Sequence, residues 1–122
     1  MKPIALAFVL LFAVAFSVQA QDCEQAGSNM AAVRACLYEA LEKDLDAAYR
    51  PLHRKVAGKD AQAGALLQKS QASWRAFVED SCAFTTRVNV DGAIEEDARY
   101  NCQVDFTNAR IKVLKAWMGQ QK

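Results

Sequence analysis

Four cysteines in a chain of 122 residues constrain the fold more than any other feature of this sequence. An even number of cysteines in a small exported chain is typical of disulfide pairs. No two of them stand two to four residues apart, which disfavours a zinc knuckle, a thioredoxin motif and a haem attachment site. We therefore predict two disulfides and no metal or other cofactor. The cysteines are Cys23, Cys36, Cys82 and Cys102.

Residues 1–20 have the pattern of a cleaved signal peptide. Lys2 precedes an uncharged apolar run from Ile4 to Phe16, and Val18-Gln19-Ala20 supplies the small residues of a cleavage site. The run is shorter than the ~20 apolar residues that a membrane-spanning helix needs. We expect one mature domain over residues 21–122, periplasmic or secreted, with no membrane attachment after cleavage.

The mature domain is expected to carry no net charge. Without Lys2, the basic residues equal the 14 acidic residues in number, and neither sign forms a block. Nucleic-acid-binding proteins usually carry a basic footprint, and proteins held on membrane surfaces often carry a polybasic segment. The charge pattern therefore argues against both kinds of partner.

Apolar residues recur every three or four positions along most of the domain, which is the period of an amphipathic helix. The first such stripe runs from Met30 to Val56, with Ser28 or Asn29 as the N-cap. Pro51 should kink or restart this helix, and residues 57–59 should end it. Its polar face carries two favourably ordered i, i+4 ion pairs, Glu39 with Lys43 and Asp46 with Arg50.

A second helix is predicted from the N-cap Asp60 to about Cys82, and a third from Ile94 onward. The short connection at residues 57–59 makes the first two helices antiparallel. The sequence therefore predicts an all-α fold, a small antiparallel three-helix bundle stabilised by two disulfides. The second stripe comprises Leu66, Leu67, Ser70, Trp74, Phe77, Val78 and Ser81, and the third Ile94, Ala98, Cys102, Phe106, Ala109, Val113, Leu114 and Trp117.

Two disulfide pairings remain open in this arrangement. Cys23–Cys36 with Cys82–Cys102 would tie the N-terminal arm to the first helix and close the connection between the second and third helices. Cys36–Cys82 with Cys23–Cys102 is the alternative, because the helical hairpin brings the regions of Cys36 and Cys82 to the same end.

Residues 83–93 lack helical periodicity and are predicted to form an 11-residue loop. The segment from Thr85 to Val90 favours extended structure, and Asp91-Gly92 is a turn signal. A long loop in a compact domain is often functional. We expect this one to bind a partner protein through Thr86, Arg87, Asn89 and Asp91.

Five polar residues beside the apolar stripes predict a network that links the three helices. We expect Asp46 or the Tyr49 hydroxyl to meet Arg110, and such a network fixes helix register when its members are buried. Trp74 and Trp117 lie on the stripes and are predicted to pack in the core. The five polar residues are Asp46, Tyr49, Gln71, Thr107 and Arg110.

No catalytic constellation is evident. His53 is the one histidine and has no nucleophile motif near it. Glu42 and Asp46 stand at i, i+4 spacing on one helical face, but basic neighbours make a solvated surface the simpler interpretation. We therefore predict that the protein is not an enzyme.

The order of these residues resembles the lysozyme inhibitor LprI-like domain family. The four cysteines combine with Leu45-Asp46-Ala47-Ala48-Tyr49, with Gln71-Ala72-Ser73-Trp74 and with Thr107-Asn108-Ala109-Arg110, five residues after Cys102. The resemblance covers nearly the whole mature domain. It implies a small exported bacterial protein with lysozyme as the partner, and a loop with polar or cationic groups would suit the carboxylates of a lysozyme cleft. The alternative is a periplasmic chaperone or envelope assembly factor that uses exposed apolar helix faces.

Overall fold

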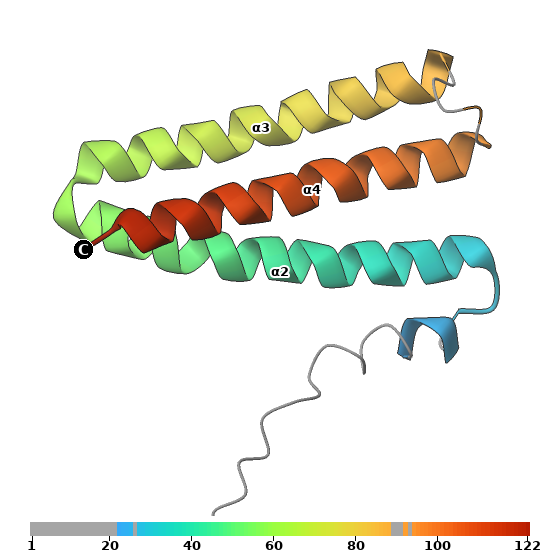
Figure 1. Cartoon of the computed structure of the whole chain (residues 1–122), viewed down its shortest axis with the longest axis horizontal. Helices are drawn as coiled ribbons and strands as arrows, with labels where there is room; N and C mark the ends of the chain where they lie inside the picture. Colours follow the sequence, from blue (N-terminus) through green and yellow to red (C-terminus); the bar gives the residue numbers. More distant parts are fainter. Residues whose placement is uncertain (1–21, 26, 89–91, 93) are drawn as a thin grey trace, which may run out of the picture.

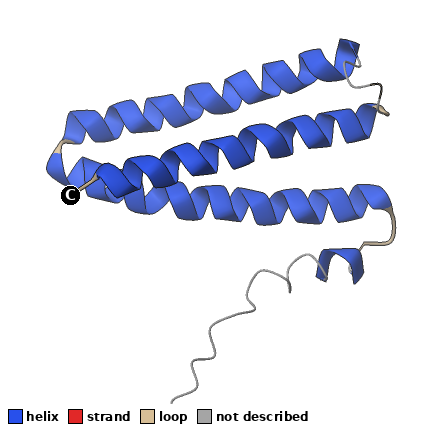
Figure 2. Ribbon diagram, in the orientation of Figure 1, coloured by secondary structure: helices blue, strands red, loops and turns tan. Residues whose placement is uncertain are grey.

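The computed structural model describes residues 22–25, 27–88, 92 and 94–122. This part of the chain is all-helical and contains no strand (Figure 2). A helical turn at residues 22–25 precedes three long helices, α2 (Met30–Lys59), α3 (Ala61–Val88) and α4 (Glu95–Gln120). The predicted signal peptide lies outside the described residues. Within them, no helix has the length and apolar character needed to cross a membrane.

The three long helices pack against one another, each contacting the other two. Successive helices run in opposite directions, and the C-terminus lies beside the turn between α2 and α3 (Figure 1). α2 has 30 residues and is therefore about 45 Å long. The domain is thus an elongated, all-helical body whose two ends are well separated.

Asp60 alone connects α2 to α3. Its carboxylate Oδ1 accepts hydrogen bonds from the backbone N–H groups of Gln62 and Ala63, at 2.9 and 3.1 Å. Its own N–H donates to the carbonyl of Val56 at 2.9 Å. The predicted N-cap at Asp60 is therefore confirmed, and the same residue also ends α2.

The first helix begins as predicted, but it is not interrupted where the sequence predicted a break. Asn29 is the N-cap, since its side chain accepts from the N–H of Ala32 at 3.0 Å. The helix then runs through Pro51 without restarting and includes residues 57–59. Proline removes one backbone hydrogen bond, and the packing of a helix face outweighs that loss.

The predicted 11-residue loop is also wrong over its first half. α3 continues to Val88, so residues 83–88 are helical, and the second helix does not end at Cys82. β-branched residues lower helix propensity only slightly. Here the hydroxyl of Thr85 donates to the carbonyl of Cys82 at 3.2 Å, within the helix itself. Residues 89–91 and 93 lie outside the described part of the chain.

The apolar core lies nearer the α2–α3 turn than the opposite end. It contains Leu45 and Leu52 of α2, Leu67 of α3, and Ile111 and Leu114 of α4. The helix period placed most of these correctly, but it also assigned to the core five large apolar side chains that are exposed. These are Met30, Leu66, Phe77, Ile94 and Val113.

α4 differs most from its expected face. Its buried residues include Thr107, Arg110 and Ile111, whereas Ala109 on the predicted stripe is exposed. α4 contacts both other helices, so its buried face is broader than one apolar stripe and includes polar positions. A rule that assigns only apolar residues to the core could not find this face.

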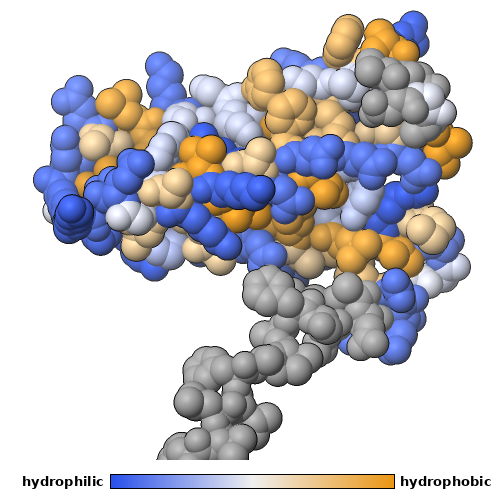
Figure 3. Space-filling model, viewed as in Figure 1, coloured by the Kyte–Doolittle hydropathy of each residue, from blue (hydrophilic) through white to orange (hydrophobic). Residues whose placement is uncertain are grey.

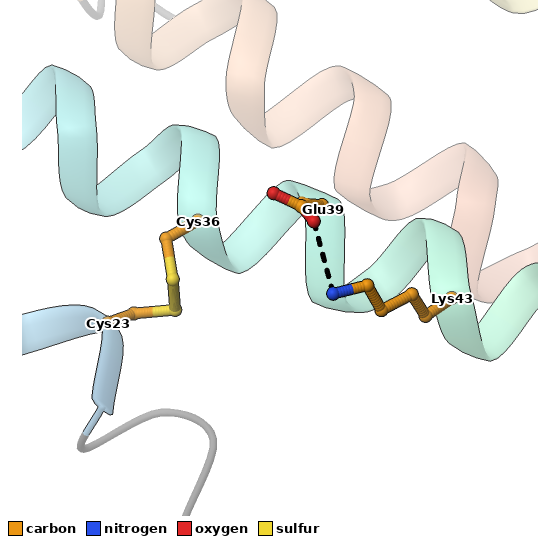
Figure 4. Close-up of a disulfide and its surroundings, with 4 residues drawn as sticks. All are labelled: Cys23, Cys36, Glu39 and Lys43. Carbon is orange, nitrogen blue, oxygen red and sulfur yellow. Dashed lines mark ion pairs between the residues drawn. A yellow bond between two sulfur atoms is a disulfide. The ribbon is translucent and has the colours of Figure 1, made fainter. Parts of the chain in front are cut away.

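Two disulfides join Cys23 to Cys36 and Cys82 to Cys102, with Cα–Cα distances of 5.5 and 5.6 Å. The first attaches the turn at residues 22–25 to α2, and Figure 4 shows it one turn from the Glu39–Lys43 ion pair. The second joins the last turns of α3 to the first turns of α4. Both lie at the end of the molecule opposite Asp60, which we call the disulfide end.

Two glycines near the α2–α3 turn provide a matched test of close helix packing. A Cβ atom added at Gly64 would lie 2.5 Å from Ala57 Cβ and 2.9 Å from its Cα, whereas one added at Gly58 meets nothing within 4 Å. Gly58→Ala should stabilise the fold by up to ~1 kcal/mol through helix propensity. Gly64→Ala should destabilise it by about 1–3 kcal/mol through overpacking. Urea unfolding measures both, and equal stabilisation by the two changes would show that α2 and α3 do not approach this closely.

Candidate functional site

Arg110 of α4 is a buried cation at the centre of the molecule. Its guanidinium carbon lies 5.8 Å from the ring centroid of Trp74 on α3 and 5.2 Å from that of Trp117 on α4. The faces of aromatic rings carry negative charge density and attract cations, most strongly where water is excluded. The two tryptophans therefore stabilise the charge that they cover.

Neutral side chains of α3 bind the same guanidinium. Nε donates to Oε1 of Gln71 at 2.9 Å, and Nη2 donates to Oγ of Ser70 at 3.1 Å. Within the described residues no carboxylate pairs with Arg110. Burial disfavours the charged form and lowers the pKa of Arg110, although an arginine keeps its proton at neutral pH. We call Ser70, Gln71, Trp74, Arg110 and Trp117 the Arg110 cluster.

Only part of the expected polar network meets. Gln71 and Arg110 are joined directly, but Asp46 pairs with Arg50 at 2.7 Å on the surface of α2. Tyr49 stacks on His53 with 5.5 Å between ring centroids. Thr107 is fully buried, and its side chain lies close to the Tyr38 hydroxyl. Asp46 and Tyr49 instead contact neighbours on α2, and their predicted contact with Arg110 does not form.

Sequence reasoning assigned Ser70 only to an apolar stripe and missed its bond to Arg110. The sequence contained a signal for this contact. Ser70 directly precedes Gln71, and both lie within four residues of Trp74 on the same helix. The same reasoning treated Trp74 and Trp117 as core residues alone. They are partly buried against the leucine core and also cover the guanidinium.

Tyr38 marks a second polar region, nearer the disulfide end. Burial and the adjacent Glu42 carboxylate raise the pKa of Tyr38, because both disfavour the phenolate. Glu42 pairs with Arg75 of α3 at 2.8 Å, and Arg34 of α2 pairs with Asp97 of α4. These pairs link the three helices outside the leucine core. A cavity of about 320 Å³ opens between them, lined by Tyr38, Trp74, Arg75, Val78, Glu79, Arg99 and Gln103.

A larger and more apolar cavity, of about 360 Å³, lies near the α2–α3 turn. Two of its lining residues, Ser70 and Trp117, also contact Arg110. The buried guanidinium is therefore directly behind its wall. We call it the turn-end cavity; its lining is Leu52, Val56, Leu66, Leu67, Ser70, Trp117, Gln120 and Gln121.

Two of the four residues predicted to bind a partner, Thr86 and Arg87, lie at the disulfide end. Thr86 and Arg87 lie on the last turn of α3, where Arg87 is exposed and the Thr86 hydroxyl is buried. Asn89 and Asp91 lie outside the described residues. Sequence reasoning missed the apolar neighbours, since Phe84, Val88 and Ile94 are each about half or more exposed. We call Phe84, Arg87, Val88 and Ile94 the disulfide-end surface, and Figure 3 shows hydrophobic side chains over this end of α3.

The groups considered for catalysis are occupied in other contacts. His53 stacks on Tyr49, Glu42 pairs with Arg75, and Asp46 pairs with Arg50. In the described ranges, no three His, Cys, Asp or Glu side chains gather in a way that could hold a metal ion. The arrangement offers surfaces and cavities for binding.

Removing the amide that binds Arg110 tests the Arg110 cluster. Gln71→Leu keeps the size of the side chain but leaves Nε of Arg110 without its acceptor, so we expect a loss of about 1–3 kcal/mol in the free energy of unfolding. Gln68→Leu is the matched control, because Gln68 is exposed on the same helix and its change should stay within about 0.5 kcal/mol. Thermal unfolding of both variants measures the difference. Equal stability of the two would contradict a structural role for the Gln71 bond.

Comparison with known families places these features in one group. The family model described as Lysozyme inhibitor LprI matches residues 20–114. This range includes all four cysteines, the disulfide-end surface, and every residue of the Arg110 cluster except Trp117. Searches of curated proteins and of solved structures give no match. From the extent of the family match, the chain belongs to the lysozyme inhibitor LprI family.

Proposed function

We propose that this protein is exported and inhibits a lysozyme-type muramidase by binding it, without catalysis. The family match over residues 20–114 carries this proposal. The signal-peptide pattern in residues 1–20 supports export to the periplasm or the medium, where two disulfides persist. The mature protein would then be a disulfide-stabilised three-helix bundle, residues 21–122, that meets its partner outside the cytoplasm.

We further propose that the disulfide-end surface contacts the muramidase. Lysozyme uses two carboxyl groups in its cleft, so an exposed cation on an inhibitor complements the charge there. Arg87 supplies that cation, with Phe84 and Val88 as apolar neighbours on the same helix end. The Cys82–Cys102 disulfide holds this end to α4, which reduces the entropy lost on binding. Asn89 and Asp91 are proposed to add polar contacts, whereas the Thr86 hydroxyl is buried and does not face a partner.

Inhibition is measured by mixing the purified mature protein with lysozymes of several classes and following lysis of a cell-wall substrate. We expect slower lysis by at least one class. Arg87→Ala and Phe84→Asp should each weaken inhibition about tenfold or more, as central interface residues do. Arg54→Ala is the matched control for Arg87, since Arg54 is an exposed arginine on α2, near the opposite end.

Two results would contradict parts of this proposal. Unchanged lysis for every class at large molar excess of the protein would contradict inhibition itself. Inhibition that is unaffected by Arg87→Ala and Phe84→Asp, but lost in Arg54→Ala, would move the contact away from the disulfide end.

Exposed apolar side chains favour one alternative, a periplasmic chaperone or envelope assembly factor. Phe84 is 64% exposed and Ile94 is 60% exposed, and a contiguous patch of such side chains is typical of a surface that binds proteins. A chaperone should suppress aggregation of unfolded client proteins, and Phe84→Asp should reduce that effect. Light scattering of a denatured client measures it. Strong lysozyme inhibition with no effect on scattering would rule out this alternative.

A further inference from the structure

We propose that α3 pairs with α3 of a second copy of this chain, in antiparallel orientation, to form a weak homodimer. The contact uses one exposed face of α3, and the two-fold axis passes at the level of Trp74 and Arg75. This inference is independent of lysozyme inhibition, because its test measures self-association of the protein alone.

Six exposed residues of α3 follow one another at spacings of three or four, so they lie on one side of the helix. α3 lies at one edge of the bundle (Figure 1), and neither α2 nor α4 covers this side. The three apolar residues among the six are large, and each is more than half exposed. Such a face is typical of a surface that binds a protein. We call the six residues the α3 stripe: Leu66, Lys69, Ser73, Phe77, Asp80 and Phe84.

Lys69 and Asp80 are the charged residues of the stripe and have opposite signs. When two copies of α3 run antiparallel about the level of residues 74 and 75, Lys69 of each copy lies level with Asp80 of the other. Within the described ranges neither residue forms an ion pair in its own chain. A parallel two-fold pair would instead place each charge beside its own copy, and like charges in contact oppose association. The charges therefore favour the antiparallel dimer.

The other residues of the stripe match under the same symmetry. Leu66 lies level with Phe84 of the second copy, so two exposed apolar side chains meet at each end of the contact. Phe77 lies level with Ser73, whose small side chain leaves room for the aromatic ring. Burial of these apolar side chains supplies the free energy of association, and the charges determine direction and register.

The contact is small, because the helix segment from Leu66 to Phe84 is only about 27 Å long. We therefore expect weak association, with a dissociation constant of about 10–100 μM. A second copy explains the stripe better than an unrelated partner, because a two-fold interface must complement itself when reversed. An unrelated partner requires no such match between the two halves of one helix. Phe84 also belongs to the disulfide-end surface, so only the monomer would present all of that surface to a muramidase.

The test measures the molar mass of the mature protein by sedimentation equilibrium, without lysozyme, from about 1 to 500 μM, a range that brackets the expected dissociation constant. Lys69→Asp places two carboxylates at each charged contact, and Asp80→Lys places two ammonium groups there. Each change should weaken self-association about tenfold or more. An equimolar mixture of the two variants should form a heterodimer about as stable as the wild-type dimer, because each variant supplies the charge that the other lacks.

Lys115→Asp is the matched control, since Lys115 is an exposed lysine that lines a hollow between α2 and α4, and this change should leave self-association unaltered. Lys69, Asp80 and Lys115 are all exposed, so the three variants should fold, which circular dichroism verifies. Lys69→Asp should leave lysozyme inhibition intact, whereas Phe84→Asp should weaken both inhibition and self-association.

Three results would overturn the proposal. The first is a wild-type protein that remains monomeric up to about 500 μM, well above the expected dissociation constant. The second is self-association of Lys69→Asp and Asp80→Lys as strong as that of the wild type. The third is a mixture of these two variants that associates no more strongly than either variant alone.

Discussion

The buried guanidinium of Arg110 is the interaction on which the arrangement of α3 and α4 depends. Leucine side chains tolerate small shifts between helices, because dispersion and burial have little directionality. A buried cation does not tolerate such shifts, because each lost hydrogen bond leaves a charged donor without water or another partner. The hydrogen bonds of Arg110 to both Gln71 and Ser70 constrain the alignment of the two helices. The polar contact therefore sets the register in which the leucine core packs.

The two ends of the molecule are built by different physical means. At one end, disulfides attach the N-terminal turn to α2 and α3 to α4, which compensates for the small apolar core of a domain of this size. At the other, a single residue, Asp60, joins two helices and Gly64 permits their close approach to each other. Apolar side chains are exposed at the first end, and a cavity forms near the second. The exposed apolar side chains of the disulfide end and this cavity therefore lie at opposite ends of the molecule.

Local features of the fold were predictable from the sequence because they depend on residues a few positions apart. The caps at Asn29 and Asp60 and the ion pairs Glu39–Lys43 and Asp46–Arg50 all occur as expected. The end of α3 was not predictable in this way. Thr85, Thr86 and Val88 favour strands, yet helix continuation satisfies their backbone groups and a disulfide holds that end of α3.

Periodicity, caps and motif order predict the helical class, the three helical segments and the family, because all of these signals are local or ordered along the chain. Which polar residues share a site depends instead on how the helices pack. Asp46 pairs with Arg50 and the partly buried Tyr49 stacks on His53, whereas Ser70 joins Gln71 at Arg110. The reason is geometric: the partner of a buried charge depends on the register between helices, which a pattern of apolar residues along one chain does not report.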